Sequence, residues 1–383
     1  MNKYLKIILL TSGLYGISIG LYDYLFPLYL NFIGLSFEKM GWIFSLSFAF
    51  ILVFRIYLGH ISDFIGRKFF YGISLLAAAI SYSLTPLFQD FSQLAFLKTF
   101  KEISLTVKET FQPVLVFEQS KKKFIDFYGK INGISFFLEG IGILFAGWLL
   151  VHVGIRTSLI FACIPVWIAL AILIFFYKEK FVSLKERNFS PKFAFEKIPT
   201  KNAKKIIAVG FFLNLGVFIS HNFILPLYFL KKFHASLLWI AAILAVHRII
   251  LGAPMLITGK LVKKHHKEVL LYGLIFEGIM LSATVFMPTL ILAASIFLLH
   301  DFGAAFWQPI YQSYIQKFSR KTNRAKDTSI IFAYISIAKI IAPLITGYVV
   351  VVNLDLPFFL SGLVVILTGF MVLILPPISR NNE

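Results

Sequence analysis

Long apolar runs separated by short polar segments constrain this chain more than any other feature of its sequence. Two of these runs, 41–58 and 69–88, are separated only by the decapeptide 59–68, which reads Gly-His-Ile-Ser-Asp-Phe-Ile-Gly-Arg-Lys. About 20 consecutive apolar residues allow an α-helix to cross a bilayer. Two spanning helices joined by so short a basic segment must be antiparallel, so the sequence predicts an all-α membrane protein.

The composition supports this prediction. Hydrophobic residues make up 58% of the chain and charged residues only 14%, whereas soluble proteins carry about 25% charged residues. The single cysteine, Cys163, excludes an intrachain disulfide and a multi-cysteine metal cluster. Lys3 and Lys6 precede the first apolar run as in a signal peptide, but no small-residue cleavage site follows, so we expect this run to be the first span.

We expect twelve transmembrane helices in two pseudo-symmetric six-helix bundles. The first bundle is assigned to 1–177 and the second to 204–383, with a lysine-rich cytoplasmic linker at 178–203. The expected spans are 5–31, 40–59, 69–88, 92–116, 127–150, 157–177, 204–230, 236–258, 268–287, 290–315, 328–351 and 354–376.

Basic residues follow this topology. Most of the 37 Lys and Arg residues fall on the side of the N-terminus, and the other side holds only Lys39, Arg156, Lys231 and Lys232. The basic side is cytoplasmic by the positive-inside rule, which places both termini in the cytoplasm. The net charge of +19 therefore needs no nucleic-acid partner. We expect a multi-pass monomer in a prokaryotic cytoplasmic (inner) membrane, with the lipid bilayer as its surroundings.

Short matches between the two halves indicate an internal repeat. Phe-Pro-Leu-Tyr at 26–29 recurs as Leu-Pro-Leu-Tyr at 225–228, and Phe-Gln-Pro at 111–113 recurs as Trp-Gln-Pro at 307–309. Gly147-Trp148 likewise recurs as Gly347-Tyr348. All three pairs are separated by nearly the same length of chain, which favours a six-plus-six parallel repeat.

The decapeptide resembles the loop signature of the major facilitator superfamily of transporters, Gly-x-Leu-x-Asp-Arg-x-Gly-Arg-Lys. The matching residues, which we predict to form a gating loop, are Gly59, Asp63, Gly66, Arg67 and Lys68. Phe64 stands where the family prefers Arg, and the second copy at 259–267 has Lys263 in place of the aspartate. The resemblance implies two halves that rock about a site near the midplane.

The resemblance also implies that Asp63 helps to close the cytoplasmic gate. A helix N-terminus favours a nearby carboxylate, and span eleven is expected to begin near Asp327. The alternative is that Gly59 and Gly66 make a tight turn and Asp63 caps span three.

Span four carries a stripe of polar and charged residues. At about 100° per residue, they occupy one arc of the helix. Because a lipid-facing helix could not keep such a stripe, we expect it to face protein or water. Internal Lys98–Glu102 pairing is the structural alternative. The stripe consists of Lys98, Lys101, Glu102, Lys108, Glu109 and Gln112.

Other ionisable or polar residues fall inside spans that line the cavity in the family. We predict that they belong, with the stripe, to the substrate and proton pathway. They are Asp23, Arg55, Glu139, His221, Asn222, His247, Arg248, Asp301 and Lys339. His300 lies near the outer end and is expected to be solvated, and Glu277 in span nine has no assigned role.

These features predict a secondary active transporter that works by alternating access, with proton-coupled export of small organic or amphipathic compounds as the leading function. Buried carboxyl groups suit proton carriage, and the candidates are Asp23, Glu102, Glu109 and Glu139. The alternatives are a transporter of organic or inorganic anions that uses the intramembrane Arg and Lys residues and, less favoured, a transporter-like receptor. Span five lacks the proline of the export signature Gly-x-x-x-Gly-Pro-x-x-Gly-Gly.

Motifs of other protein classes are absent from the sequence. It has no Gly-x-x-x-x-Gly-Lys-Ser/Thr, no His-Glu-x-x-His and no Gly-x-Ser-x-Gly, so ATP drive and an enzymatic function are not expected. No cofactor and no metal site are predicted.

Overall fold

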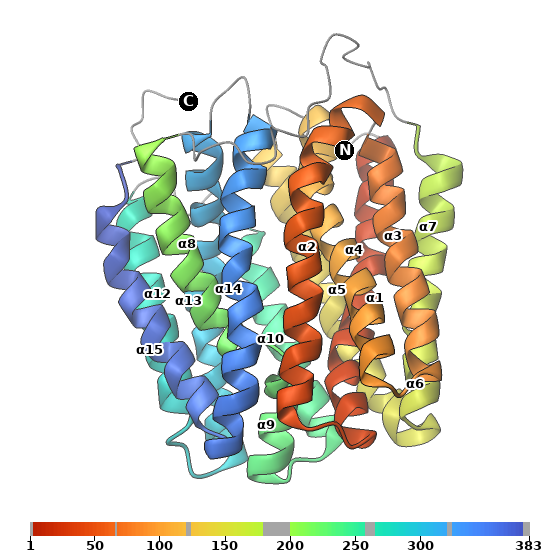
Figure 1. Cartoon of the computed structure of the whole chain (residues 1–383), viewed down its shortest axis with the longest axis vertical. Coiled ribbons are helices and arrows are strands. Elements are labelled where there is room, and N and C mark those ends of the chain that lie inside the picture. Colours follow the sequence, from red (N-terminus) through yellow and green to blue (C-terminus); the bar gives the residue numbers. More distant parts are fainter. Residues whose placement is uncertain are drawn as a thin grey trace.

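The computed structural model describes residues 3–65, 67–119, 124–178, 200–256, 265–319 and 324–377. Within these ranges the chain is helical and contains no strand, which confirms the all-α class (Figure 1). Nine helical segments of this part are long and apolar enough to cross a membrane. Helices α2 (Phe37–Ile65), α4 (Phe91–Gln119) and α12 (His266–Thr284) run alongside them.

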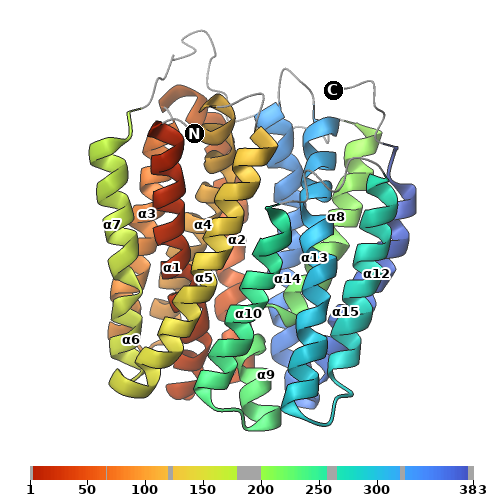
Figure 2. The same ribbon diagram turned by 180° about the vertical axis from the view of Figure 1, so that it is seen from behind.

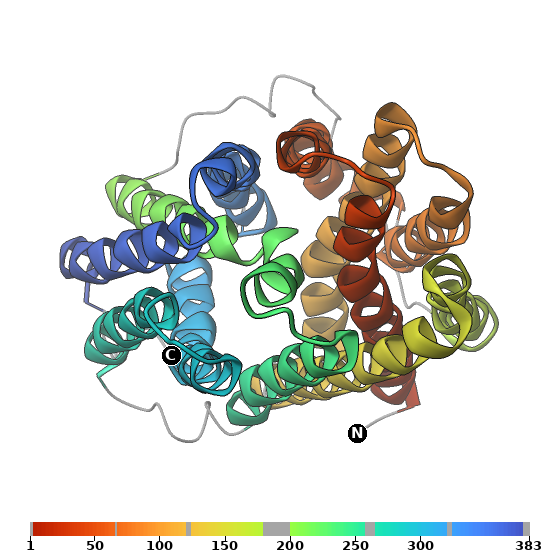
Figure 3. The same cartoon turned by 90° about the horizontal axis from the view of Figure 1, so that it is seen from below.

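The helices form two groups that lie side by side, as seen from behind in Figure 2 and from below in Figure 3. The first half contains, besides α2 and α4, helices α1 (Lys3–Phe32), α3 (Arg67–Leu84) with the 3-10 turn η1 (Thr85–Leu87), α5 (Phe124–Val153), α6 (Ile155–Phe161) and α7 (Cys163–Phe176). The second half contains, besides α12, helices α8 (Lys201–Ser220), α9 (Ile224–Phe233), α10 (Leu237–Met255), α13 (Leu290–Phe318), α14 (Arg324–Val352), α15 (Leu356–Met371) and the 3-10 turn η5 (Val372–Ile374). Most of the predicted linker 178–203 lies outside the described residues.

Helix α1 begins and α15 ends at the same end of the molecule (Figure 1). An even number of spans requires the first helix to begin and the last helix to end on the same side of the membrane. The assignment of that end to the cytoplasm stays a prediction from the charge asymmetry.

The predicted loop at 59–68 is wrong in its extent. Helix α2 continues to Ile65 and α3 begins at Arg67, so 59–65 and 67–68 are helical, and Gly66 lies outside the described residues. The sequence 60–65 contains the polar residues His60, Ser62 and Asp63 but neither Gly nor Pro. Polar residues end an apolar run without ending a helix where the helix emerges from the hydrocarbon, because water solvates the side chains there.

A break between α8 and α9 interrupts the seventh predicted span. Pro226 has no N–H to donate to the carbonyl of Asn222, and its ring disfavours a straight helix through that turn. The side chain of Asn222 compensates, because its Oδ1 accepts the Ile224 N–H at 3.1 Å and its Nδ2 donates to the Phe218 carbonyl at 2.7 Å. The break sets His221 at the C-terminus of α8.

Small residues allow α1 and α5 to pack closely. A Cβ added at Gly20 would lie 2.0 Å from the Glu139 carbonyl oxygen, and one at Gly16 would lie 2.5 Å from the Ser135 carbonyl oxygen. Gly16 and Gly20 form a Gly-x-x-x-Gly pattern, which is typical of close helix pairs in membranes. This contact fixes the positions of Ser135 and Glu139 along the axis of α1.

Glycines also mediate the contacts between the two halves. A Cβ at Gly140 of α5 would lie 2.9 Å from the Ala245 carbonyl oxygen of α10. A Cβ at Gly41 of α2 would lie 2.6 Å from the Pro343 carbonyl oxygen of α14. Gly347 of α14 packs against the turn of α2 that contains Gly41. The repeat partners Gly147 and Gly347 therefore lie in the two equivalent contacts, α5 with α10 and α14 with α2.

The α1–α5 contact generates a testable prediction. Gly20→Ala should lower the thermal unfolding midpoint of the detergent-purified protein, because the added methyl group must displace a backbone carbonyl. Gly72→Ala is the matched control, since its Cβ would meet only Leu173 Cδ2 at 3.8 Å. Removing a helical glycine there should leave the midpoint unchanged or raise it, by about 0.5–1 kcal/mol in stability. Equal midpoints for the two variants would contradict the packing argument.

Candidate functional site

Four charged side chains from α1 and α4 form one cluster inside the first half. Lys101 Nζ lies 2.8 Å from Asp23 Oδ1 and 3.2 Å from Glu102 Oε1. Lys98 Nζ lies 2.6 Å from the same Glu102 oxygen, which confirms the i,i+4 pairing expected on span four. The side chains of Lys98, Lys101 and Glu102 are buried, whereas Asp23 is 30% exposed. Two cations and two carboxylates balance within this cluster.

Aromatic rings complete the surroundings of Lys98. Its ammonium group lies 4.3 Å from the centroid of Phe44 and 5.6 Å from that of Phe26. Rings at this distance attract a cation through their quadrupoles. Lys98 is therefore held by one carboxylate and two ring faces.

The next turns of α4 place Lys108 and Gln112 against α1 and α5. Gln112 donates to Ser12 Oγ at 2.6 Å, and Lys108 Nζ is 3.5 Å from Ser135 Oγ and 4.7 Å from the Tyr15 ring centroid. Lys108 is buried. Within the described residues, no carboxylate lies within 4.0 Å of its ammonium group, so this buried cation has no ion-pair partner there.

Glu139 and Arg248 form an ion pair between the halves. Arg248 Nε on α10 lies 2.7 Å from Glu139 Oε1 on α5. The Glu139 side chain is 8% exposed and the Arg248 side chain 28%. The pair lies beside the close contact of Gly140 with Ala245 and Ile249. Both residues were predicted separately from the sequence, and the fold brings them together.

Three histidines and an aspartate meet inside the second half. His221 Nε2 lies 3.0 Å from His300 Nε2, and His247 Nδ1 lies 2.8 Å from Asp301. These residues come from the end of α8, from α10 and from α13. The expectation that His300 is solvated is wrong, because it is 1% exposed. Its position near the end of the span suggested exposure to water, but the rings of His221 and His247 pack against it.

Other predicted residues take separate places. Asn222 Nδ2 donates to Thr346 Oγ1 of α14 at 2.8 Å, and Lys339 Nζ lies 4.6 Å from the Phe218 ring centroid. Glu109 is exposed, unlike the rest of the span-four stripe.

The side chains that would test the gating prediction are outside the described part of the chain. Arg55, Gly59, Asp63, Gly66 and Arg67 fall there. Lys68, the last residue of the predicted loop, donates to the Ile174 carbonyl of α7 at 3.1 Å.

Glu277, to which the sequence assigned no role, is a buried acceptor for Trp307. The indole Nε1 of Trp307 on α13 donates to Glu277 Oε2 on α12. Gly303 permits this approach, since a Cβ there would lie 3.0 Å from Glu277 Cβ. The pair joins two helices of the second half, and only the fold reveals it because the two residues belong to different spans.

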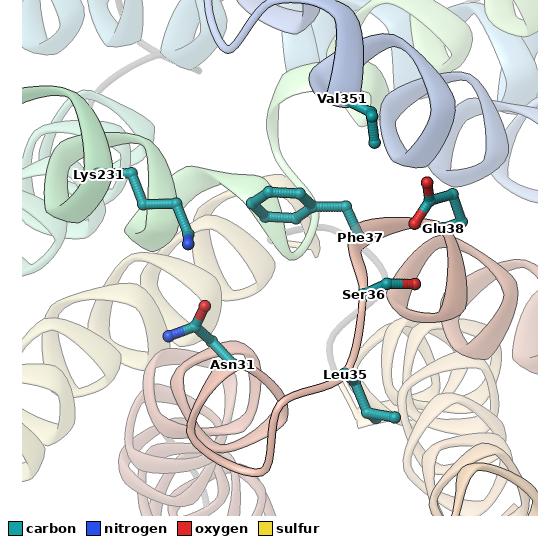
Figure 4. Close-up of a pocket in the computed structure, with 7 residues that line it drawn as sticks. All are labelled: Asn31, Leu35, Ser36, Phe37, Glu38, Lys231 and Val351. Carbon is teal, nitrogen blue, oxygen red and sulfur yellow. The ribbon is translucent and has the colours of Figure 1, made fainter.

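A pocket of about 330 Å³ lies between the halves (Figure 4). Its lining includes Asn31 near the end of α1, which is the end of the molecule opposite to the start of α1. Figure 4 shows Lys231 of α9 facing Phe37 of α2 across it, and the ammonium group lies 5.2 Å from the ring centroid. Glu38 and Asn31 also line the pocket, but none of the predicted pathway residues does.

The family model described as Major Facilitator Superfamily matches residues 8–326. The chain belongs to the major facilitator superfamily. It is therefore a multi-pass membrane transporter of small molecules and not an enzyme. A search of curated protein sequences found no match.

Solved structures with the same fold come from transporters of several solute classes. A crystal structure of a mutant of the nucleoside transporter NupG has a TM-score of 0.75 and 13% identity, and the alignment covers 97% of this chain and 99% of that one. The human organic anion transporter MFSD10 gives 0.73 and 13%, with the same coverages. A D-xylose-proton symporter gives 0.71 and 16%, covering 97% of both chains. These similarities show the fold.

The ion cluster of α4 generates a second prediction. Glu102→Gln removes the only carboxylate within 4.0 Å of Lys98 in the described structure and one of two beside Lys101. Breaking a buried ion pair costs about 3–5 kcal/mol, so the thermal unfolding midpoint should fall strongly. Asp23→Asn should cost less, because Lys101 keeps Glu102 and Asp23 is partly exposed.

The control is Glu268→Gln, the same charge change at a position of α12 whose side chain is 56% exposed. It should change stability by no more than about 0.5 kcal/mol. If Glu102→Gln were as stable as this control, the cluster would not be the stabilising element inferred here.

Proposed function

We propose that this transporter is a proton-coupled carrier of small organic solutes that works by alternating access. The observation that carries the proposal is the Glu139–Arg248 ion pair between α5 and α10, on opposite halves. Alternating access requires the halves to change their contacts, and a carboxylate in that contact can be neutralised by one proton. Protonation of Glu139 would remove the attraction to Arg248 and free the guanidinium group.

The α4 cluster supports proton coupling in a second way. Asp23 is its most exposed carboxylate and shares Lys101 with Glu102. A proton that arrives at Asp23 would leave Lys101 still paired, so the cluster can change its charge without leaving a buried ammonium group alone. Glu102, which accepts from two lysines, is better suited to a structural role.

Two substrate classes follow from the charges. Export of cationic or amphipathic compounds requires a carboxylate that is free to meet the solute, and Asp23 is more exposed than Glu102 and Glu139. Binding of an organic anion requires a free cation, and Lys108 is buried without an ion-pair partner among the described residues. Because Asp23, Glu102 and Glu139 each already contact a cation, the contacts favour the organic anion.

Proton coupling can be tested in proteoliposomes with radiolabelled benzoate as the anion and tetraphenylphosphonium as the lipophilic cation. We expect a pH gradient to drive accumulation of the transported probe, and a protonophore to abolish it. Glu139→Gln should reduce gradient-driven accumulation at least tenfold while solute counterflow persists, because the variant cannot exchange the coupling proton. Accumulation that survives collapse of the pH gradient would contradict proton coupling.

The substrate class can be tested at Lys108. Lys108→Met should weaken benzoate binding by about 10–100-fold, as expected for the loss of a charged hydrogen-bond donor worth about 1.5–3 kcal/mol. Binding can be followed by ligand-induced thermal stabilisation of the purified protein. The control is Lys204→Met, at an exposed position of α8, which should bind as the wild type does. If tetraphenylphosphonium stabilises the wild type and benzoate does not, the cationic class is correct.

A further inference from the structure

The histidine cluster of the second half is not needed for the proton switch proposed above. His221, His247 and His300 each offer a ring nitrogen, and these three atoms lie within 4.8 Å of one another. The rings are held by separate elements, namely the C-terminus of α8, α10 and α13. Their convergence therefore results from tertiary packing and not from the local spacing of one helix.

The partners of the Nδ1 atoms determine the state of the Nε2 atoms. His300 Nδ1 is hydrogen-bonded to the Phe297 carbonyl oxygen. His221 Nδ1 lies 2.8 Å from Ser220 Oγ and 3.2 Å from the Val217 carbonyl oxygen. A carbonyl oxygen only accepts, so Nδ1 of His300 carries the proton, whereas the Ser220 hydroxyl can donate to Nδ1 of His221 or accept from it. In a neutral imidazole that is protonated at Nδ1, the Nε2 atom is an acceptor.

The Nε2 atom of His300 therefore offers a lone pair to the ring of His221. His221 Nε2 and His300 Nε2 are 3.0 Å apart, and Asp301 Oδ1 lies 3.5 Å from His300 Nε2. When Ser220 accepts from His221 Nδ1, both Nε2 atoms present lone pairs, which repel at this distance unless a cation lies between or beside them. The nearby Phe297 ring, 4.6 Å from the His300 ring centroid, keeps the site apolar on that side, which increases the cost of leaving the lone pairs unmatched.

His247 provides the independent observation that points to a ligand. Its Nδ1 lies 2.8 Å from the Asp301 carboxylate, so its Nε2 is also an acceptor. That Nε2 atom is buried and has no hydrogen-bond partner among the residues that the structure describes. A buried polar atom without a partner is costly, and this one belongs to a residue only 3% exposed.

We propose that His221, His247 and His300 bind one divalent transition-metal ion of the Zn²⁺ class, and that Asp301 positions His247. Neutral imidazole nitrogens suit Zn²⁺, Cu²⁺ and Ni²⁺. Three histidines leave a fourth coordination position open to water or to an anion. The hydrogen bond from a ligating histidine to a carboxylate is the outer contact that such sites commonly have.

The site would join the end of α8 to α10 and α13. His221 precedes the break before α9, where the chain lacks regular helical hydrogen bonds. His221 is also less buried than the other two histidines, so an ion would enter from its side. We infer that the ion holds the chain between α8 and α9 in place against α10 and α13, and that it does so whichever solute is transported.

The test uses the full-length protein, purified with an affinity tag that contains no histidine and stripped with a chelator. Titration with Co²⁺ should give the visible absorption of a nitrogen-ligated four-coordinate ion at one equivalent, and Zn²⁺ should displace it. His247→Gln should weaken Co²⁺ binding at least tenfold. Asp301→Asn should retain the absorption but weaken binding by about 10–100-fold, as outer-contact substitutions do.

His152→Gln is the control, because His152 is exposed at the end of α5, and it should bind Co²⁺ as the wild type does. If His247→Gln does not fold, His221→Gln at the less buried position replaces it. The wild-type titration is decisive by itself: no stoichiometric absorption would overturn the site and would instead favour a proton shared between His221 and His300. Unchanged binding in a folded His221→Gln or His247→Gln variant would also overturn it.

Discussion

Ionisable side chains within membrane-spanning helices must find partners inside the protein, because the hydrocarbon supplies neither water nor counterions. In this transporter the ion pair between Glu139 and Arg248 meets that requirement across the boundary between the halves. The same requirement explains why Lys98, Lys101 and Glu102 cluster on α4 with Asp23 of α1. Each pairing fixes the rotation of a helix, since turning the helix would carry a charge into lipid.

Close helix packing makes these pairings possible. Gly20 lets α1 approach the backbone of α5 at Glu139 itself, and Gly140, one residue further, lets α10 approach the same helix from the other half. The carboxylate of Glu139 therefore emerges where three helices meet. This carboxylate lies in one of the contacts between the halves, which is why we propose the proton switch there.

Much of this organisation could be predicted from the sequence. The apolar runs predicted the all-α class, and the 3.6-residue period on span four predicted the side of α4 that is buried, except at Glu109. The Lys98–Glu102 pair is local and was predicted from spacing alone. The decapeptide led to the correct family but not to the correct helix boundary, because polarity marks the membrane surface and not the end of a helix.

Contacts between residues far apart in the chain could not be predicted in this way. The sequence placed Glu139 and Arg248 in different spans, and nothing in their spacing says that they meet. Burial of His300 and the contact of Glu277 with Trp307 depend on which faces of α12 and α13 turn toward each other. Hydropathy does not resolve this, since lipid-facing and protein-facing surfaces in a membrane are similarly apolar.

A charge swap tests the central claim most directly. Glu139→Arg and Arg248→Glu should each lower the thermal unfolding midpoint, because each places like charges together at the contact between α5 and α10. The double variant restores the pair in reverse, so its midpoint should recover toward the wild-type value, with a coupling of about 0.5–3 kcal/mol. If the loss of stability in the double variant equalled the sum of the losses in the two single variants, the account would be contradicted.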